Sequence, residues 1–149
     1  MRKLLPFVMI ATALSVAPAS AQSVTVATPQ KLQWADAPQF GKGVKIAVIM
    51  GDPGQAGPYV VRLDVPPHTT FPAHTHPDTE NVTILSGTLG VGLGSKVDKS
   101  KGQRLPSGGF VSLPEGTPHF AWTDQSEVIL QIHGIGPSGM TVLGAVAKQ

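Results

Sequence analysis

Frequent glycines and prolines divide this chain into segments that are too short for helices. The 149 residues include 17 glycines and 14 prolines, and no stretch keeps a helical period over ten or more residues. Short runs rich in β-branched and apolar residues lie between the turns, as is typical of strands. The sequence therefore predicts an all-β sandwich or barrel in one domain. The predicted strands span residues 45–50, 59–65, 70–76, 80–85, 89–93, 110–113, 119–123, 127–133 and 140–146, with a further one near 31–34 and a solvated loop over 94–103.

The first 21 residues have the pattern of a secretion signal. Arg2 and Lys3 precede an apolar run over residues 4–16, and the small residues Ala19 and Ala21 form a cleavage site. An uncleaved membrane anchor is the alternative, but the run is shorter than the ~20 residues that span a bilayer. We expect cleavage after Ala21 and a periplasmic or secreted protein without membrane contact. The expected organisation is a signal peptide over 1–21, an N-terminal arm over 22–43 and a barrel over 44–146.

Charge and cysteine content exclude several classes of site. Two of the 11 Lys and Arg residues lie in the signal, which leaves nine basic residues against nine acidic ones in the mature chain. No basic patch remains to indicate a nucleic-acid partner. The chain has no cysteine, so thiolate metal sites and cysteine nucleophiles are excluded. A bound metal must therefore have nitrogen and oxygen ligands.

A short histidine motif carries the strongest chemical signal. His74 and His76 are two residues apart in a predicted strand, so their side chains point to the same face. Glu80 follows the turn that Pro77 predicts, and His119 begins a later strand. Imidazole nitrogens and carboxylate oxygens bind divalent transition metals. The function of the chain depends on whether these four side chains meet.

The sequence around these residues resembles the cupin superfamily. The first cupin motif is a glycine, five residues, H-x-H, three or four residues, E, six residues and G; the second is G, five residues, P-x-G, two residues, H, three residues and N. The first motif is matched at His74, His76, Glu80 and Gly87, and the second at Gly108, Pro114, Gly116 and His119. His68 replaces the leading glycine of the first motif and Thr123 replaces the asparagine of the second. Neither position is a metal ligand in the family.

The resemblance implies a cupin double-stranded β-helix, or jelly-roll barrel, with one divalent metal ion. The implied ligands are His74, His76, Glu80 and His119, and the implied metals are manganese, iron, zinc, nickel or copper. A barrel without metal is the alternative, although cupins that have lost the metal usually lose ligands and this chain keeps all four. Cupins often pair through their sheets, so the resemblance also implies a homodimer.

Strand periodicity predicts the other residues of the pocket. Val82 and Ile84 share the face of Glu80, and Ala121 and Thr123 share that of His119. Gln131 and His133 share a further face and are also candidates for the lining, with a structural role as the alternative. Phe120 and Trp122 face the opposite way and are expected outside the barrel, at a subunit contact. Asp78 is expected to be a turn residue, because a metallo-β-lactamase-like motif would need histidine where Thr79 stands.

Two functions fit this pattern. The first is a metal-dependent enzyme with dioxygenase-like or isomerase-like chemistry on a small molecule, which would bind the metal through oxygen atoms. The second is a non-catalytic periplasmic module that binds or senses a small ligand or a metal. No general base stands out beyond the four candidate ligands, and this keeps both functions open.

Overall fold

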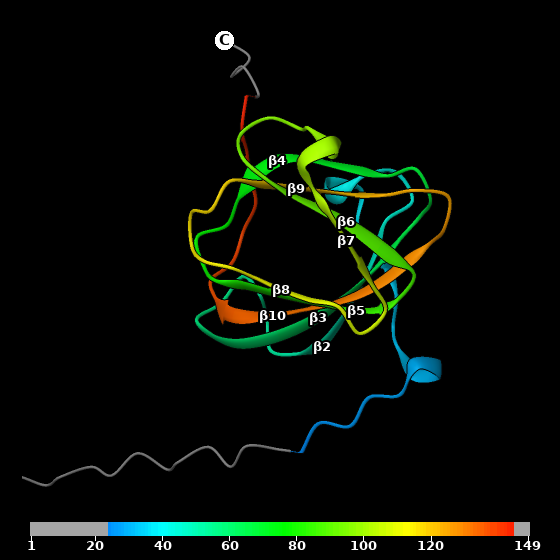
Figure 1. Ribbon diagram of the computed structural model, residues 1–149. Helices are drawn as coiled ribbons and strands as arrows, with labels where there is room; N and C mark the ends of the chain where they lie inside the picture. The colour runs from blue at the N-terminus through cyan, green and yellow to red at the C-terminus, as the bar shows by residue number, and fades with distance from the viewer. Residues whose placement is uncertain (1–23, 145–149) are drawn as a thin grey trace, which may run out of the picture.

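The computed structural model describes residues 24–144, which form two antiparallel sheets that face each other (Figure 1). The strand order is β1-β2-β3-β10-β5-β8 in one sheet and β11-β4-β9-β6-β7 in the other. The strands are β1 (Ala35–Asp36), β2 (Lys45–Met50), β3 (Gly57–Val65), β4 (Thr70–Thr75), β5 (Glu80–Ser86), β6 (Thr88–Leu93), β7 (Gln103–Pro106), β8 (Phe110–Leu113), β9 (His119–Thr123), β10 (Val128–Gly136) and β11 (Thr141–Val142). Three short 3-10 helices are η1 (Pro29–Lys31), η2 (Pro38–Phe40) and η3 (Lys99–Lys101). The predicted all-β jelly-roll architecture is confirmed.

The hydrophobic core lies between the sheets. In β3 the burial alternates, with Val61, Leu63 and Val65 buried and the residues between them partly exposed. Phe71 of β4 and Leu89 of β6 join the same cluster from the other sheet. Each such buried side chain stabilises the fold by about 1.5–3 kcal/mol. Several of these core residues, such as Leu63 and Phe71, also line the cavity beside the histidines.

The chain ends differ from the prediction in detail. Strand β1 pairs with β2, Ala37 is fully buried, and Phe40 of η2 packs against the core. The described part of the predicted arm is thus joined to the barrel, and its strand lies at Ala35–Asp36 instead of 31–34. The predicted signal peptide and the residues after 144 lie outside the described residues. Within residues 24–144, no helix has the length and hydropathy needed to cross a membrane.

Strand β7 is absent from the predicted strands, and only its first residue, Gln103, falls within the predicted loop over 94–103. It forms the edge of its sheet, where Gly90 pairs with Arg104. Most side chains of its sequence, Gln-Arg-Leu-Pro, are exposed, so the strand does not need apolar residues. Charged residues and proline are tolerated at sheet edges. An edge strand of this kind lacks the apolar pattern on which the prediction relied.

Phe120 and Trp122 do point away from the cavity, but their own chain covers them. Both rings are buried, and the segment around η3 lies over Trp122, with Lys99 Nζ 5.7 Å and Arg104 Cζ 5.8 Å from the ring centre. Gly90 leaves the space for that ring, since a Cβ there would lie 2.1 Å from it. The prediction of a subunit contact through these two rings is therefore wrong.

The two departures from the cupin motifs meet at one corner of the barrel. His68 has a φ of 58°, the left-handed conformation that glycine adopts most easily. Its N–H donates to the Asp124 carbonyl at 2.8 Å. Thr123 Oγ1 donates to the Pro66 carbonyl at 2.6 Å and accepts from the Thr69 N–H at 2.9 Å. The threonine in place of asparagine thus holds the turn in which a histidine replaces glycine.

We predict that His68→Gly stabilises the protein by about 0.5–1 kcal/mol. The left-handed conformation costs a residue with a Cβ roughly 1–2 kcal/mol, and the greater freedom of glycine in the unfolded chain offsets part of that gain. Urea unfolding at equilibrium measures the difference. His68→Ala is the matched control, because it removes the imidazole and keeps the strain. Equal stability of the glycine and alanine variants would contradict the prediction.

Candidate metal centre

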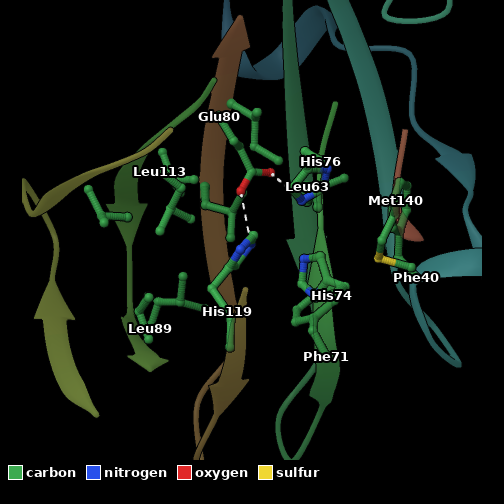
Figure 2. A pocket seen from close by; sticks show the side chains of 16 residues that line it. Phe40, Leu63, Phe71, His74, His76, Glu80, Leu89, Leu113, His119 and Met140 are labelled. Carbon is green, nitrogen blue, oxygen red and sulfur yellow. Dashed lines mark ion pairs between the residues drawn. The ribbon is translucent and has the colours of Figure 1, made fainter. Parts of the chain in front are cut away.

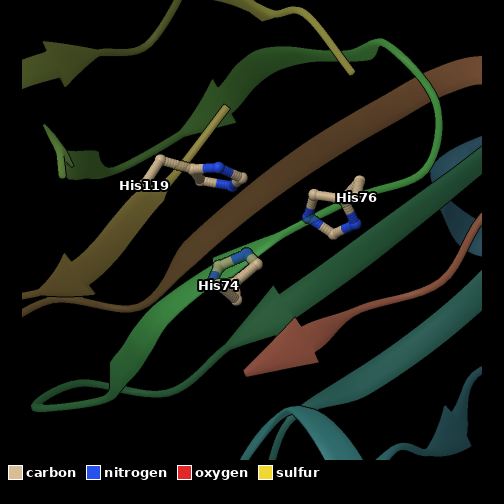
Figure 3. Close-up of side chains that lie close together, drawn as sticks. All are labelled: His74, His76 and His119. Atoms are coloured by element: carbon tan, nitrogen blue, oxygen red, sulfur yellow. The ribbon is translucent and has the colours of Figure 1, made fainter. Parts of the chain in front are cut away.

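Three histidines converge at the open end of the barrel (Figures 2 and 3). The register of β4 with β9 places His74 directly opposite His119, and His76 follows the end of β4. Their candidate ligand atoms all lie within 4.8 Å of one another. One ion about 2.1 Å from each nitrogen can bridge such a spacing after small side-chain adjustments. Strands β4 and β9 of one sheet thus supply two imidazoles, and the residue that follows β4 supplies the third.

Backbone carbonyls fix the orientation of all three rings. His74 Nδ1 lies 2.6 Å from the Pro72 oxygen, His76 Nδ1 2.6 Å from the Gly139 oxygen, and His119 Nδ1 2.9 Å from the Thr117 oxygen. A carbonyl can only accept, so each Nδ1 carries the proton and donates. Each Nε2 is then the ring nitrogen that remains available to a metal ion. Metal-binding histidines are held in this way in proteins generally.

Glu80, the first residue of β5, completes the cluster from the other sheet. Its carboxylate oxygens lie 3.6 Å from His76 Nε2 and 3.5 Å from His119 Nε2 (Figure 2). His76 Nε2 is buried without a hydrogen-bond partner. Basic nitrogens that face a buried carboxylate need a cation or a proton between them. The donor set and the unpartnered nitrogen therefore fit a divalent transition metal.

The protonation of the cluster agrees with this fit. Burial lowers the pKa of His74 to about 4, so this imidazole is neutral at pH 7. Burial alone would raise the pKa of Glu80, but the hydrogen bond from His119 and the charges of the histidines outweigh it and lower that pKa. Burial likewise opposes the charged form of His119, but Glu80 raises its pKa. A metal ion bound here replaces the proton that His119 and Glu80 otherwise share.

A cavity of about 60 Å³ adjoins the four side chains. Val82 and Ala121, both expected in the pocket, line it. Ile84 belongs to the same core cluster as Val82 but does not line the cavity. Thr123 is at the far end of β9, where its hydroxyl binds the Pro66 carbonyl. The shared strand face was inferred correctly, but Ile84 and Thr123 lie too far along their strands to reach the cavity.

Gln131 and His133 do not line the cavity. Along β10 the residues that face it are Leu130 and Ile132, so the alternate residues point outward. Gln131 Oε1 accepts from Arg62 Nε at 3.0 Å on the outer face of the sheet, and His133 is exposed there. Their placement in the lining was a wrong choice between the two faces of β10.

Motif reading missed two lining residues that come from outside the long strands. Phe40 belongs to η2, and Met140 lies between β10 and β11. Met140 directly follows Gly139, whose carbonyl orients His76. Strand periodicity cannot reveal such residues, because their place depends on how the two ends of the chain fold over the barrel.

Asp78 is more than a turn residue. It lies between His76 and Glu80 in the chain, is buried, and accepts a hydrogen bond of 2.8 Å from the hydroxyl of Tyr59 in β3. Its other oxygen, Oδ1, is buried without a partner. The bond ties the segment between two candidate ligands to the opposite side of the barrel mouth.

Sequence comparison identifies the family. The family described as "ChrR Cupin-like domain" matches residues 22–137, most of the chain. The chain belongs to this cupin family. This cupin is also 39% identical over 84 residues to Germin-like protein subfamily 2 member 1 of Arabidopsis thaliana, which covers 54% of the chain and 38% of the relative. It thus spans well under half of the length of that curated relative.

Solved structures agree on the fold. The polyketide cyclase RemF from Streptomyces resistomycificus superposes with a TM-score of 0.69 at 15% identity, over 84% of this cupin and 89% of that chain. The DMSP lyase DddQ from Ruegeria pomeroyi gives 0.61 at 17% identity, over 87% of this cupin and 75% of that chain. At these identities the likeness establishes the shared barrel and no shared activity.

We predict that Tyr59 ionises near pH 12. Burial, together with the hydrogen bond to Asp78 and its charge, raises the pKa of Tyr59 to about 12 although Ser138 opposes the shift. Because the pKa is higher in the folded protein than in the unfolded chain, stability is full below about pH 10 and falls as the pH rises towards 12. Tyr59 is the only tyrosine, so the ultraviolet tyrosinate band reports it alone. Asp78→Asn should lower this pKa, and Asp64→Asn, on the outer face of the same β3 strand, should not. Titration near pH 10 in the unmodified folded protein would contradict the prediction.

Proposed function

We propose that this cupin is an exported metal-dependent enzyme that acts on a small molecule bound at the histidine cluster. The observation that carries the proposal is the donor set: three imidazoles, each with Nδ1 on a backbone carbonyl and Nε2 turned towards the cluster, beside a buried carboxylate. His74, His76, Glu80 and His119 would hold the ion and leave coordination positions open towards the cavity. Manganese, iron, zinc, nickel and copper all suit these nitrogen and oxygen ligands.

The reaction class proposed is dioxygenase-like or isomerase-like. A bound metal would supply Lewis-acid or redox activation of the substrate. The chain itself contributes binding, orientation and exclusion of water, because apolar side chains from both sheets surround the cluster. The enzymes RemF and DddQ, named as a cyclase and a lyase, share this fold and support an enzymatic role by analogy.

A non-catalytic binding or sensing module is the second candidate. One observation favours it: among the described residues that line the cavity, only the four candidate ligands can ionise. An enzyme of this design must obtain any proton transfer from a ligand, from the substrate or from water. Turnover of a substrate by the metal-loaded protein would decide between the two functions.

We predict about one equivalent of a single transition metal per chain in the protein isolated from its native compartment. His76→Ala combined with His119→Ala should remove it, because two of the three imidazoles are lost. His133→Ala is the matched control and should keep the metal, since that histidine lies on the outer face of β10. Elemental mass spectrometry gives the measurement. A protein without metal that also takes none up when metal is added would overturn the proposal.

Export is part of the proposal and has its own test. The family match begins at residue 22, the first residue after the predicted cleavage site, which supports processing there. We expect the mature protein to begin at Gln22, as measured by intact mass after fractionation of the cells. Replacing Ala19 and Ala21 together by leucine should block cleavage, and Ala17→Leu should not. A cytosolic chain that retains residues 1–21 would count against export. Homodimer formation stays a prediction.

A further inference from the structure

Two adjoining hollows lie at the candidate metal centre. The inner one is the 60 Å³ cavity that also touches His74 and His119. The outer one has about 170 Å³ and is lined by the turn residues Gly54 and Gly139, both exposed, so it reaches the surface. The outer hollow therefore offers a route from the surface to the cluster, since His76 and Glu80 line both hollows.

Phe40 and Met140 lie where the hollows join. The residues that line both hollows are Phe40, Leu63, His76, Glu80, Ile132 and Met140. Leu63 and Ile132 belong to long central strands and His76 and Glu80 to the cluster, whereas Phe40 and Met140 come from short segments at the two chain ends. Figure 2 shows them on the side of His74 and His76, away from Leu89 and Leu113. Of the residues at the junction, these two alone lie outside both the strands and the histidine cluster.

The charge of the filled site limits what the cavity accepts. A divalent ion, the Glu80 carboxylate and three neutral imidazoles sum to one positive charge. No other charged side chain lines the inner hollow among the described residues, and its wall is otherwise apolar. An uncompensated charge in such surroundings is unfavourable. A ligand with one negative charge would neutralise it, whereas a dianion would leave the opposite charge.

The volume of the inner hollow sets a second limit on the ligand. The inner hollow has room for about four to six water-sized groups. The ion takes one of these places, which leaves three to five or so for heavy atoms of a ligand. Acetate and propanoate are of this size. A longer chain must extend past Phe40 and Met140 into the outer hollow.

We propose that Phe40 and Met140 form a size filter that selects short aliphatic monoanions with an oxygen donor, of the carboxylate class, for the metal centre. This inference rests on the proposed function, because it requires metal at the cluster. Met140 is the adaptable part of the filter, since methionine is unbranched and flexible, and Phe40 is the rigid part. The two side chains select against bulky ligands, and the charge of the site selects against neutral molecules and dianions.

The test is a titration of the cobalt-loaded protein with straight-chain carboxylates from acetate to octanoate, followed by the visible spectrum of the metal. Affinity should rise by roughly fourfold per methylene while the chain fits the apolar hollow. It should stop rising or fall near butanoate, where the chain reaches the filter. Butyramide and succinate should each bind at least about tenfold more weakly than butanoate.

Variants of Phe40 and Met140 test whether these two residues set the limit on chain length. The break is the chain length at which the affinity stops rising. Met140→Ala should move it to acids at least two carbons longer, and Phe40→Leu should move it less. The matched controls Met50→Ala and Phe110→Ala alter exposed residues outside both hollows and should leave the series unchanged. Since Met50 and Met140 are the only methionines after residue 21, methyl NMR of the zinc-loaded protein gives two signals. Butanoate should shift that of Met140 alone.

The outcomes separate this inference from the proposed function. A protein that takes up no cobalt overturns both. Three results with the cobalt-loaded protein would overturn the filter alone. They are an affinity that does not change along the acid series, equal affinity for butyramide and butanoate, and a limiting chain length that neither Met140→Ala nor Phe40→Leu changes. A break that moves in these variants and stays in the controls supports it.

Discussion

The pairing of β4 with β9 is the constraint on which the candidate site depends. It sets His74 against His119 across two neighbouring strands, and a shift of register by one residue would turn either histidine to the other face of the sheet. The backbone then fixes the rings as well as the strands, because the carbonyls of Pro72 and Thr117, each two residues before a histidine, accept from Nδ1. The orientation of His74 and His119 therefore comes from local backbone geometry and requires no other side chain.

His76 is held differently, and the difference links the site to the end of the chain. Its Nδ1 donates to the carbonyl of Gly139, which is 63 residues away. That segment stays in place through the N–H of Leu143, which donates to the Ala73 carbonyl at 2.8 Å, and through β11, which pairs with β4. The third imidazole thus takes its orientation from tertiary structure. Its position is only as rigid as the segment between β10 and β11.

The sequence was sufficient for the parts of the fold that follow a local rule. Period-two patterns in β3 and β5 predicted these strands, and the spacing of His74, His76 and Glu80 predicted that their side chains meet. The same rule failed for Gln131, because a strand pattern shows two faces and does not say which one is inward. It could not place Phe40 or Met140 at all, since neither is part of a regular strand. The open part of the pocket is built from long-range packing, which no short window of sequence contains.

The apolar cavity and the polar cluster have complementary effects on any chemistry at the site. Every ionisable group among the described lining residues is a candidate ligand, so a small molecule in the cavity would meet ionisable groups only at the candidate metal centre and mostly apolar contacts elsewhere. Under the proposed function, binding energy from an aliphatic part would orient the oxygen donor towards the one place where charge can be stabilised. Gly139 and Met140 are adjacent, so the segment proposed to admit the ligand also orients His76. A ligand that displaced Met140 would act on the residue next to a carbonyl that orients a candidate ligand, and the size of the ligand would thereby affect the geometry of the centre itself.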